Sequence, residues 1–334
     1  MPADRLLTYL EIKVHHLIQD RVWGEIRIVG GYDRSRVISD LEKDDKAFNW
    51  QRPTASVEGD CLTLHCYPGR DYVLHYGLIV ATYLSMRGHI ACRVTVEEPA
   101  EMVCAEAVDA LLLDAADVEL VIVGWGLDAF TSLDGWVKGN GFSRKRDMLA
   151  GQPVLYLGYL HSIWGDVAGR VVTRLAELGA KRVLYVGKVG SLEPEVEPNE
   201  FLATGNSSIL EGDTVSWTDF FGSDLQNSDG VIHGLHISSP SILLEDKDWL
   251  AGLTHGMFVD PEIGWMGLAA EQAGIEYGYL HVISNNLARE RDEDLSNERL
   301  SSTVQRRRVL RERIRKSVEE RLRAICEPER VIHA

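Results

Sequence analysis

The sequence has few of the features that mark secreted, zinc-binding or membrane proteins. Its 334 residues include only five cysteines, an odd number with no C-x-x-C pair, which argues against a disulfide framework and a structural zinc site. No apolar stretch reaches the roughly 18 residues of a membrane span, and the first residues carry acids where a signal peptide is apolar. We therefore expect a globular protein of the reducing cytoplasm.

Basic residues are scarce as well. Lys and Arg number 35 against 51 Asp and Glu, a formal charge of −16, and such a surface repels nucleic-acid phosphates and anionic lipid. We expect neither a nucleic-acid nor a membrane partner. The local exception is residues 299–325, a predicted helix with ten Lys or Arg against three Glu. An apolar face favours a helix docked on the acidic body over a nucleic-acid contact; it consists of Leu300, Val304, Leu310, Ile314, Val318, Leu322 and Ile325.

Hydrophobic residues make up 45% of the chain and charged residues 26%, which is enough apolar material for a packed core. Short apolar runs alternate with segments of helical spacing, and this alternation predicts an α/β layer architecture. The predicted helices are residues 2–20, 71–86, 100–112, 167–178, 263–273 and 299–325. The predicted strands are residues 26–29, 61–65, 90–96, 120–123, 154–157, 182–186, 201–204, 214–217, 235–238 and 279–283.

A glycine-spaced segment follows the predicted strand 182–186 and is expected to be a turn. Gly187 and Gly190 let backbone N–H groups approach an anion closely, and Lys188 between them adds a fixed positive charge. Many strands simply end at glycine, so this segment alone is a weak indication of an anion site.

Polar residues also open the predicted helix 263–273. Asp260, Pro261 and Glu262 precede it directly. Pro suits a first helical turn and the helix dipole favours acids there, so capping alone explains these residues. The functional alternative is a carboxylate that accepts hydrogen bonds from sugar hydroxyls.

A third polar pair, Asn285 and Asn286, follows the predicted buried strand 279–283. Asn is common in turns for local reasons, so this pair alone also favours a structural explanation.

In this order, however, the segments resemble the nucleoside phosphorylase and nucleosidase superfamily, of the purine nucleoside phosphorylase, uridine phosphorylase and methylthioadenosine nucleosidase type. The resemblance covers about residues 118–326. The segments that carry it are residues 179–192, 201–205, 234–239, 259–262 and 284–286. It implies a three-layer twisted mixed sheet flanked by helices, a homo-oligomer, and cleavage of the N-glycosidic bond between a ribose and a base.

The resemblance also implies roles for individual residues. Glu262 is expected to accept hydrogen bonds from the ribose hydroxyls and Asn285 to face the leaving base, which makes these two the expected catalytic residues. Substrate contacts are expected from Asn286, Pro261 and His161, although a lone histidine at a strand end is more often only a satisfied polar residue. The expected phosphate-binding residues are Gly124, Gly126, Gly187, Lys188 and Gly190.

Four positions depart from the family pattern. Asn285 stands where aspartate is usual, and an amide cannot supply a proton. Tyr185 replaces a phosphate-binding arginine, and Lys188, where Ser or Thr is usual, holds an anion less well than a bidentate guanidinium. Pro261 replaces a methionine that packs under the sugar. These departures leave the dependence on phosphate open.

We expect phosphorolysis to free base and ribose 1-phosphate, with phosphate as co-substrate and no other cofactor. Lys188 favours this reaction, whereas the missing arginine at Tyr185 favours a hydrolytic nucleosidase. A catalytically silent nucleoside-binding scaffold is the third alternative, and the retained Glu262 argues against it. No paired histidine spacing predicts a metal site.

Residues 1–117 lie outside the resemblance. They are predicted to form a separate α/β segment, followed by the nucleoside phosphorylase-like domain over residues 118–334. The sequence leaves three roles open for the segment: oligomer contacts, a lid, or a second binding function.

Overall fold

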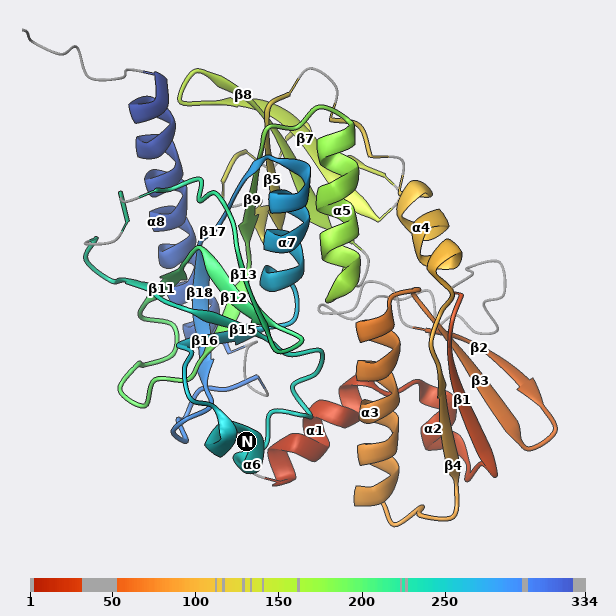
Figure 1. The fold of residues 1–334 in the computed structure, drawn as a ribbon. Coiled ribbons are helices and arrows are strands. Elements are labelled where there is room, and N and C mark those ends of the chain that lie inside the picture. Colours follow the sequence, from red (N-terminus) through yellow and green to blue (C-terminus); the bar gives the residue numbers. More distant parts are fainter. Residues whose placement is uncertain are drawn as a thin grey trace, which may run out of the picture.

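The computed structural model describes residues 3–31, 53–111, 113–115, 118–127, 130–132, 134–139, 141–160, 163–222, 224–225, 228–295 and 300–326. Within these ranges the chain forms three β-sheets with helices packed against them (Figure 1). None of the helices in these ranges is long and apolar enough to cross a membrane.

The first sheet has the strand order β2-β3-β1-β4, with β2 antiparallel to β3 and the other neighbours parallel. Its strands are β1 (Glu25–Gly30), β2 (Thr54–Glu58), β3 (Cys61–Cys66) and β4 (Arg93–Glu97). The helices of this part are α1 (Ala3–Lys13), α2 (His16–Asp20), α3 (Arg70–Met86) and α4 (Glu101–Asp109). The predicted strands 26–29 and 61–65 and the predicted helix 71–86 are confirmed.

The predicted single helix over residues 2–20 is wrong, because His15 divides it. The backbone of His15 is extended (φ −62°, ψ 139°), and its Nδ1 accepts a hydrogen bond from the backbone N–H of Leu17. His15 therefore caps α2 and ends the preceding run. The predicted strand 90–96 begins only at Arg93, and the predicted helix 100–112 ends at Asp109.

The other two sheets are both mixed. The six-stranded sheet has the order β17-β9-β5-β8-β7-β6, and the eight-stranded sheet the order β13-β12-β15-β16-β10-β18-β11-β14. The strands of the first are β5 (Leu120–Gly124), β6 (Val137–Lys138), β7 (Phe142–Leu149), β8 (Gln152–Tyr159), β9 (Arg182–Val186) and β17 (Glu276–Tyr279). The strands of the second are β10 (Lys188–Ser191), β11 (Leu202–Thr204), β12 (Ser207–Leu210), β13 (Asp213–Ser216), β14 (Val231–His233), β15 (His236–Ser238), β16 (Phe258–Asp260) and β18 (His281–Asn286).

Two predictions in this region are wrong. The glycine-spaced segment is not a turn: Lys188–Ser191 forms β10, which pairs with β16 on one side and β18 on the other and so satisfies its backbone groups in the ladder. Residues 279–283 are not one strand, because Leu280 separates β17 from β18. Only one residue separates β9 from β10, and only one separates β17 from β18. The chain therefore passes twice from the six-stranded sheet directly into the eight-stranded sheet.

The six-stranded sheet is the middle of three layers. Along β5, β8 and β9, alternate apolar side chains point to opposite faces. Val121, Val123, Leu155, Leu157, Val183 and Tyr185 share a core with α5 (Asp166–Glu177) and α7 (Ile263–Ala273). Leu120, Ile122, Val154, Tyr156, Leu184 and Val186 share a second core with α8 (Ser301–Cys326). The predicted α/β fold, a mixed sheet flanked by helices, is confirmed (Figure 1).

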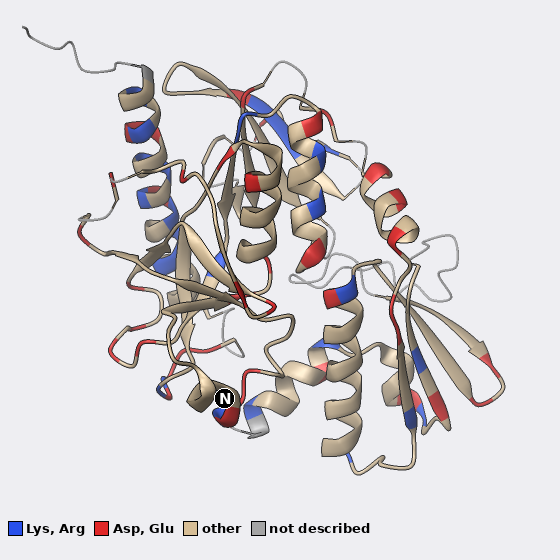
Figure 2. Ribbon diagram, in the orientation of Figure 1, with Lys and Arg blue, Asp and Glu red and all other residues tan. Residues whose placement is uncertain are grey.

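Helix α8 docks on the body through an apolar seam formed by Leu310, Ile314, Val318 and Leu322. Lys and Arg residues occur along its length (Figure 2), and Arg321 pairs with Asp224 at 2.9 Å. The seam begins later than predicted: Leu300 is 54% exposed and Val304 52%. The first turns of α8 instead pass along the cavity described below.

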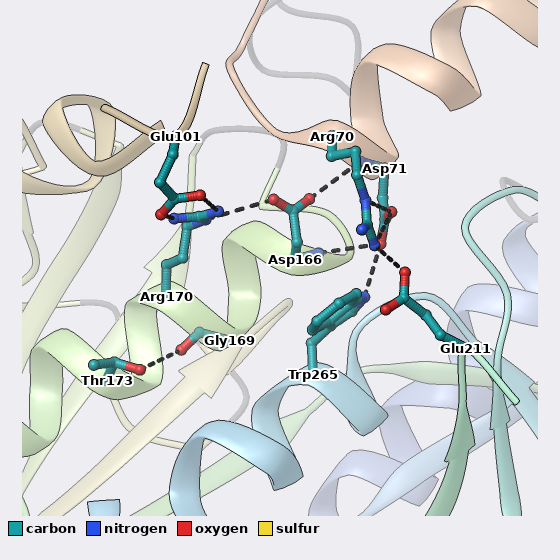
Figure 3. Close-up of polar contacts among 9 residues, drawn as sticks. All are labelled: Arg70, Asp71, Glu101, Asp166, Gly169, Arg170, Thr173, Glu211 and Trp265. Atoms are coloured by element: carbon teal, nitrogen blue, oxygen red, sulfur yellow. Dashed lines mark hydrogen bonds and ion pairs between the residues drawn. The ribbon is translucent and has the colours of Figure 1, made fainter. Parts of the chain in front are cut away.

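A polar junction joins the N-terminal helices to α5 and α7 (Figure 3). Asp71 of α3 and Asp166 of α5 each accept a hydrogen bond from the other's backbone N–H, at 3.2 and 3.1 Å. Trp265 of α7 donates its Nε1–H to the Asp71 carboxylate at 2.8 Å. Arg170 of α5 adds a hydrogen bond to Glu101 of α4 at 2.7 Å. The junction fixes these four helices together, while the predicted domain boundary at residue 117 stays a prediction.

Candidate functional site

A cavity of about 550 Å³ lies between α1, the six-stranded and eight-stranded sheets, and the first turns of α8. Its wall includes six of the expected site residues from four separate segments: Gly126, Lys188, Gly190, Pro261, Glu262 and Asn285. The cavity thus brings both expected catalytic residues, Glu262 and Asn285, together with part of the expected phosphate site.

The remaining expected residues are not among the described residues that line the cavity. Asn286 donates from its Nδ2 to the backbone oxygens of Glu193 and Val196, at 2.7 and 2.8 Å, which ties the segment after β10 to the end of β18. Gly124 allows a close approach of β5 to β9, since a Cβ there would lie 1.8 Å from the Val186 carbonyl oxygen. A Cβ on Gly187 would lie 2.9 Å from His281 Nε2.

His161 lies outside the described residues. Its expected contact with an anion or a 5′-hydroxyl therefore stays a prediction.

Asp260, rather than Glu262, caps α7. Its Oδ1 accepts hydrogen bonds from the backbone N–H groups of Glu262 and Ile263, at 2.9 and 2.8 Å, and the Glu262 side chain makes no cap bond. Capping therefore explains Asp260 but leaves the carboxyl group of Glu262, only 7% exposed, on the cavity wall.

The Glu262 carboxyl group sits in a setting that disfavours its charge. Burial, followed by the nearby Asp260 carboxylate, raises the pKa of Glu262 well above its usual range. Tyr185 opposes this shift, since its hydroxyl donates to Glu262 Oε2 at 3.4 Å. Tyr185 thus positions the Glu262 carboxyl group on the cavity wall.

Two buried histidines hold the Asp260 turn. The backbone N–H of Asp260 donates to His236 Nε2 at 2.9 Å, and His236 Nδ1 lies 2.9 Å from Ser208 Oγ. His281 Nε2 lies 3.7 Å from Asp260 Oδ2, and burial lowers the pKa of His281 to about 4, so this ring is neutral at pH 7. His236 thus fixes the turn through its hydrogen bonds, whereas His281 packs beside the Asp260 carboxylate without a hydrogen bond to it.

Asn285 is oriented by its neighbour. The Ser284 hydroxyl donates to Asn285 Oδ1 at 2.9 Å, so the amide nitrogen is the group that remains to donate elsewhere. A Cβ on Gly190 would lie 3.3 Å from Asn285 Nδ2, which places this nitrogen beside β10. Asn285 is thereby prepared to donate a hydrogen bond but not a proton.

Two arginines of α8 were missed by the sequence analysis. Arg311 lies against the loop after β5, because a Cβ on Gly126 would be 2.5 Å from its Cζ. Arg307 is 5% exposed and donates from Nε to Asn199 Oδ1 at 2.6 Å. Both line the cavity. Their spacing of four residues puts them on one helix face, a signal that the sequence carries.

The cavity has further walls that no motif pointed to. Tyr9 and Lys13 come from α1, and Glu245 from the segment after β15. Burial raises the pKa of Glu245 to about 7, against a lowering hydrogen bond from Ser239. Within the described ranges, no group of three His, Cys, Asp or Glu side chains could hold a metal ion.

Comparisons with known proteins give faint likenesses. No protein-family model matches the chain. A curated protein named oxidoreductase cns1, from the fungus Cordyceps militaris, is 25% identical over 258 residues, covering 67% of this chain and 32% of that protein. The chain thus spans about a third of the length of this curated relative.

Solved structures of two kinds are similar in outline. Uridine phosphorylase from Vibrio fischeri matches with a TM-score of 0.48 and 14% identity, over 65% of this chain and 95% of that chain. Helicobacter pylori 5′-methylthioadenosine/S-adenosylhomocysteine nucleosidase matches with a TM-score of 0.47 and 14% identity, over 61% of this chain and 99% of that chain. Likenesses of this strength assign no activity to this chain.

Proposed function

We propose that this cavity cleaves the N-glycosidic bond of a nucleoside by phosphorolysis, giving the free base and ribose 1-phosphate. The observation that carries the proposal is the meeting of Glu262, Asn285 and Lys188 in one cavity of about 550 Å³. That volume suits a nucleoside, because small-molecule pockets span about 300 to 1,000 Å³. Homo-oligomeric assembly and a cytoplasmic location belong to the same proposal.

Glu262 serves the ribose. As the C1′–N bond breaks, positive charge develops on the sugar, and a carboxylate in a buried cavity stabilises that charge more than it stabilises the neutral substrate. Because burial raises the pKa of Glu262, the ionised group gains most when sugar hydroxyls and a developing cation stand beside it. The hydrogen bond from Tyr185 holds the carboxylate in place.

Asn285 serves the base. The base leaves with the electron pair of the C1′–N bond, and Asn285 Nδ2 donates a hydrogen bond to the negative charge that develops there. An amide supplies no proton, so the base takes its proton from water or from the phosphate monoanion.

The phosphate oxygen that attacks C1′ is held by cations from two elements. Lys188 lies on β10, and Arg311 lies against Gly126 in the loop after β5. The Arg311 guanidinium offers the bidentate geometry that phosphate favours, which compensates for the tyrosine at position 185. The presence of the Arg311 guanidinium on the cavity wall is the reason that we favour phosphorolysis over hydrolysis.

A panel of purine and pyrimidine nucleosides, incubated with and without phosphate and followed by base release, tests the proposal. We expect base only when phosphate is present, together with one equivalent of ribose 1-phosphate. Release without phosphate would make the protein a hydrolytic nucleosidase. Binding of a nucleoside without any release would contradict the proposal and favour a silent binding protein.

A further inference from the structure

Helix α1 places a cation on the cavity wall from outside the part of the chain that resembles nucleoside phosphorylases. Lys13 stands in the last turn of α1 and lines the cavity together with Tyr9. Its Nζ lies 5.2 Å from the centre of the Tyr9 ring, a distance at which the ring face attracts the ammonium group. The position of this cation is therefore set by a neighbouring side chain.

The helix that carries Lys13 is firmly anchored. Leu10 and Val14, on either side of it, are 0% and 1% exposed. The Tyr76 hydroxyl of α3 donates to the backbone oxygen of Lys13 at 3.4 Å. Arg5, near the start of the same helix, pairs at 3.1 Å with Asp294, next to a residue of the cavity wall. A helix held at these points is a fixed wall of the site.

The same wall also contains an aromatic side chain, Trp164, and the histidine behind it is uncharged. Trp164 lines the cavity and stacks on His75, with ring centres 4.3 Å apart. Burial, and then the nearby Lys13 ammonium, lower the pKa of His75 to about 3, so this ring is neutral. His75 is also fixed, because its Nδ1 lies 2.8 Å from Ser241 Oγ. Because His75 is neutral, Lys13 supplies the positive charge beside Trp164 and Tyr9.

From this wall we infer that the substrate carries an anionic group on the 5′ side of its ribose, so that a nucleoside 5′-monophosphate is preferred over the nucleoside and Lys13 is the residue that selects it. The inference rests on the proposed function, which gives the ribose hydroxyls to Glu262, the base to Asn285, and the attacking phosphate to Lys188 and Arg311. The substituent that remains is at C5′. Tyr9, Lys13 and Trp164 form an unassigned part of the wall that carries a cation. The other unassigned charged groups among the described lining residues are Glu245 and Arg307. A lysine is a point-charge partner for phosphate.

The test compares the four common ribonucleosides with their 5′-monophosphates on the full chain, by calorimetric binding and by base release. We expect a monophosphate to bind about tenfold more tightly than its nucleoside. Lys13→Met is expected to reduce this preference to about twofold or less while leaving nucleoside binding unchanged, and Lys13→Arg to keep it. Lys181→Met, which removes an exposed lysine ahead of β9, serves as the matched control and is expected to keep the preference.

Three results would overturn the inference. These are equal binding of nucleosides and monophosphates, an equal loss for both in Lys13→Met, and a loss of inorganic phosphate binding in that variant with the nucleotide preference intact. Thermal unfolding of each variant shows that the chain is folded. Cleavage of nucleosides with no preference for nucleotides would contradict this inference and leave the proposed function standing. Tighter binding of nucleotides with no release of base would contradict the proposed function instead.

Discussion

At the scale of single residues, Glu262 combines a buried carboxyl group with a setting that keeps it available. Asp260 takes the capping bonds of α7, and Tyr185 donates to Glu262 Oε2. Burial and the Asp260 charge raise the pKa of Glu262. Ionisation of Glu262 therefore lowers the free energy of unfolding of the folded chain, and this loss can be measured.

The pH dependence of stability follows from this shift. An unfolded chain releases the glutamate proton near pH 4.3, whereas the folded chain retains it to higher pH, so the free energy of unfolding falls as the pH rises from about 5 toward the pKa of folded Glu262. Glu262→Gln removes this titration. We expect its Tm, relative to the wild type, to rise by about 2 °C or more between pH 5 and pH 8.

Glu271→Gln is the matched control, because Glu271 lies exposed on α7, the helix that Glu262 directly precedes. It is expected to show no such trend. A Tm difference between Glu262→Gln and the wild type that stays constant across this pH range would show that Glu262 ionises as readily in the folded chain as in the unfolded one.

Some of the site was predictable from single residues and some was not. Glu262 and Asn285 stand directly at element ends, where local motifs mark them, and both reach the cavity. Arg311 stands 185 positions after Gly126 (311 − 126), and only packing of α8 against the sheet brings the two together. Asn286 has the same side chain as its neighbour Asn285, yet its amide nitrogen donates to the backbone oxygens of Glu193 and Val196. The sequence alone does not distinguish the two.

At the scale of elements, the loop after β5 and helix α8 act as a pair. Gly126 has φ of +66°, a left-handed conformation that favours glycine, and the Arg311 guanidinium fills the space where a Cβ would be. The glycine therefore lets the loop fold and lets the arginine reach the cavity.

Gly126→Ala is expected to displace the Arg311 guanidinium and to weaken phosphate binding by about tenfold, with a loss of about 1–2 kcal/mol in stability from the strained backbone. Phosphate titration calorimetry and thermal unfolding measure the two effects. Gly179→Ala is the control, since Gly179 also has a positive φ (+104°) but an added Cβ meets nothing within 4 Å. It is expected to lose stability only. Unchanged phosphate affinity in Gly126→Ala would mean that Arg311 does not hold phosphate.

Elements were predictable where one physical signal dominated. Helix 263–273 was predicted at its observed bounds, because Pro261 precedes it and Gly274 ends it in a left-handed conformation. Strand β7 has the sequence FSRKRDML and was missed, since its charged residues hide the strand pattern. Strand β10 was missed because glycine is a common strand breaker, and pairing on both sides outweighs that preference here.

At the scale of the whole molecule, three parts of the chain meet at one cavity. The sheet supplies Lys188 and Asn285, the N-terminal part supplies Lys13 on α1, and the C-terminal helix supplies Arg311. The junction at Asp71 and Asp166 fixes α3 to α5 and so holds the N-terminal part against the rest (Figure 3). This arrangement was beyond sequence reasoning, because residues far apart in the chain approach only through the packing of whole layers.

Base release by Glu262→Gln beside Glu271→Gln, on the nucleoside or nucleotide that the wild type cleaves best, is the decisive test of the proposed cleavage in this cavity. We predict that Glu262→Gln lowers kcat/KM by about a hundredfold or more, the size of effect seen when one stabilising group is removed from a buried transition state. Glu271→Gln, the same substitution at an exposed position of the helix that Glu262 precedes, is predicted to keep the wild-type rate. A Glu262→Gln variant that is folded and releases base as fast as the wild type would contradict the claim that this cavity is the site of cleavage.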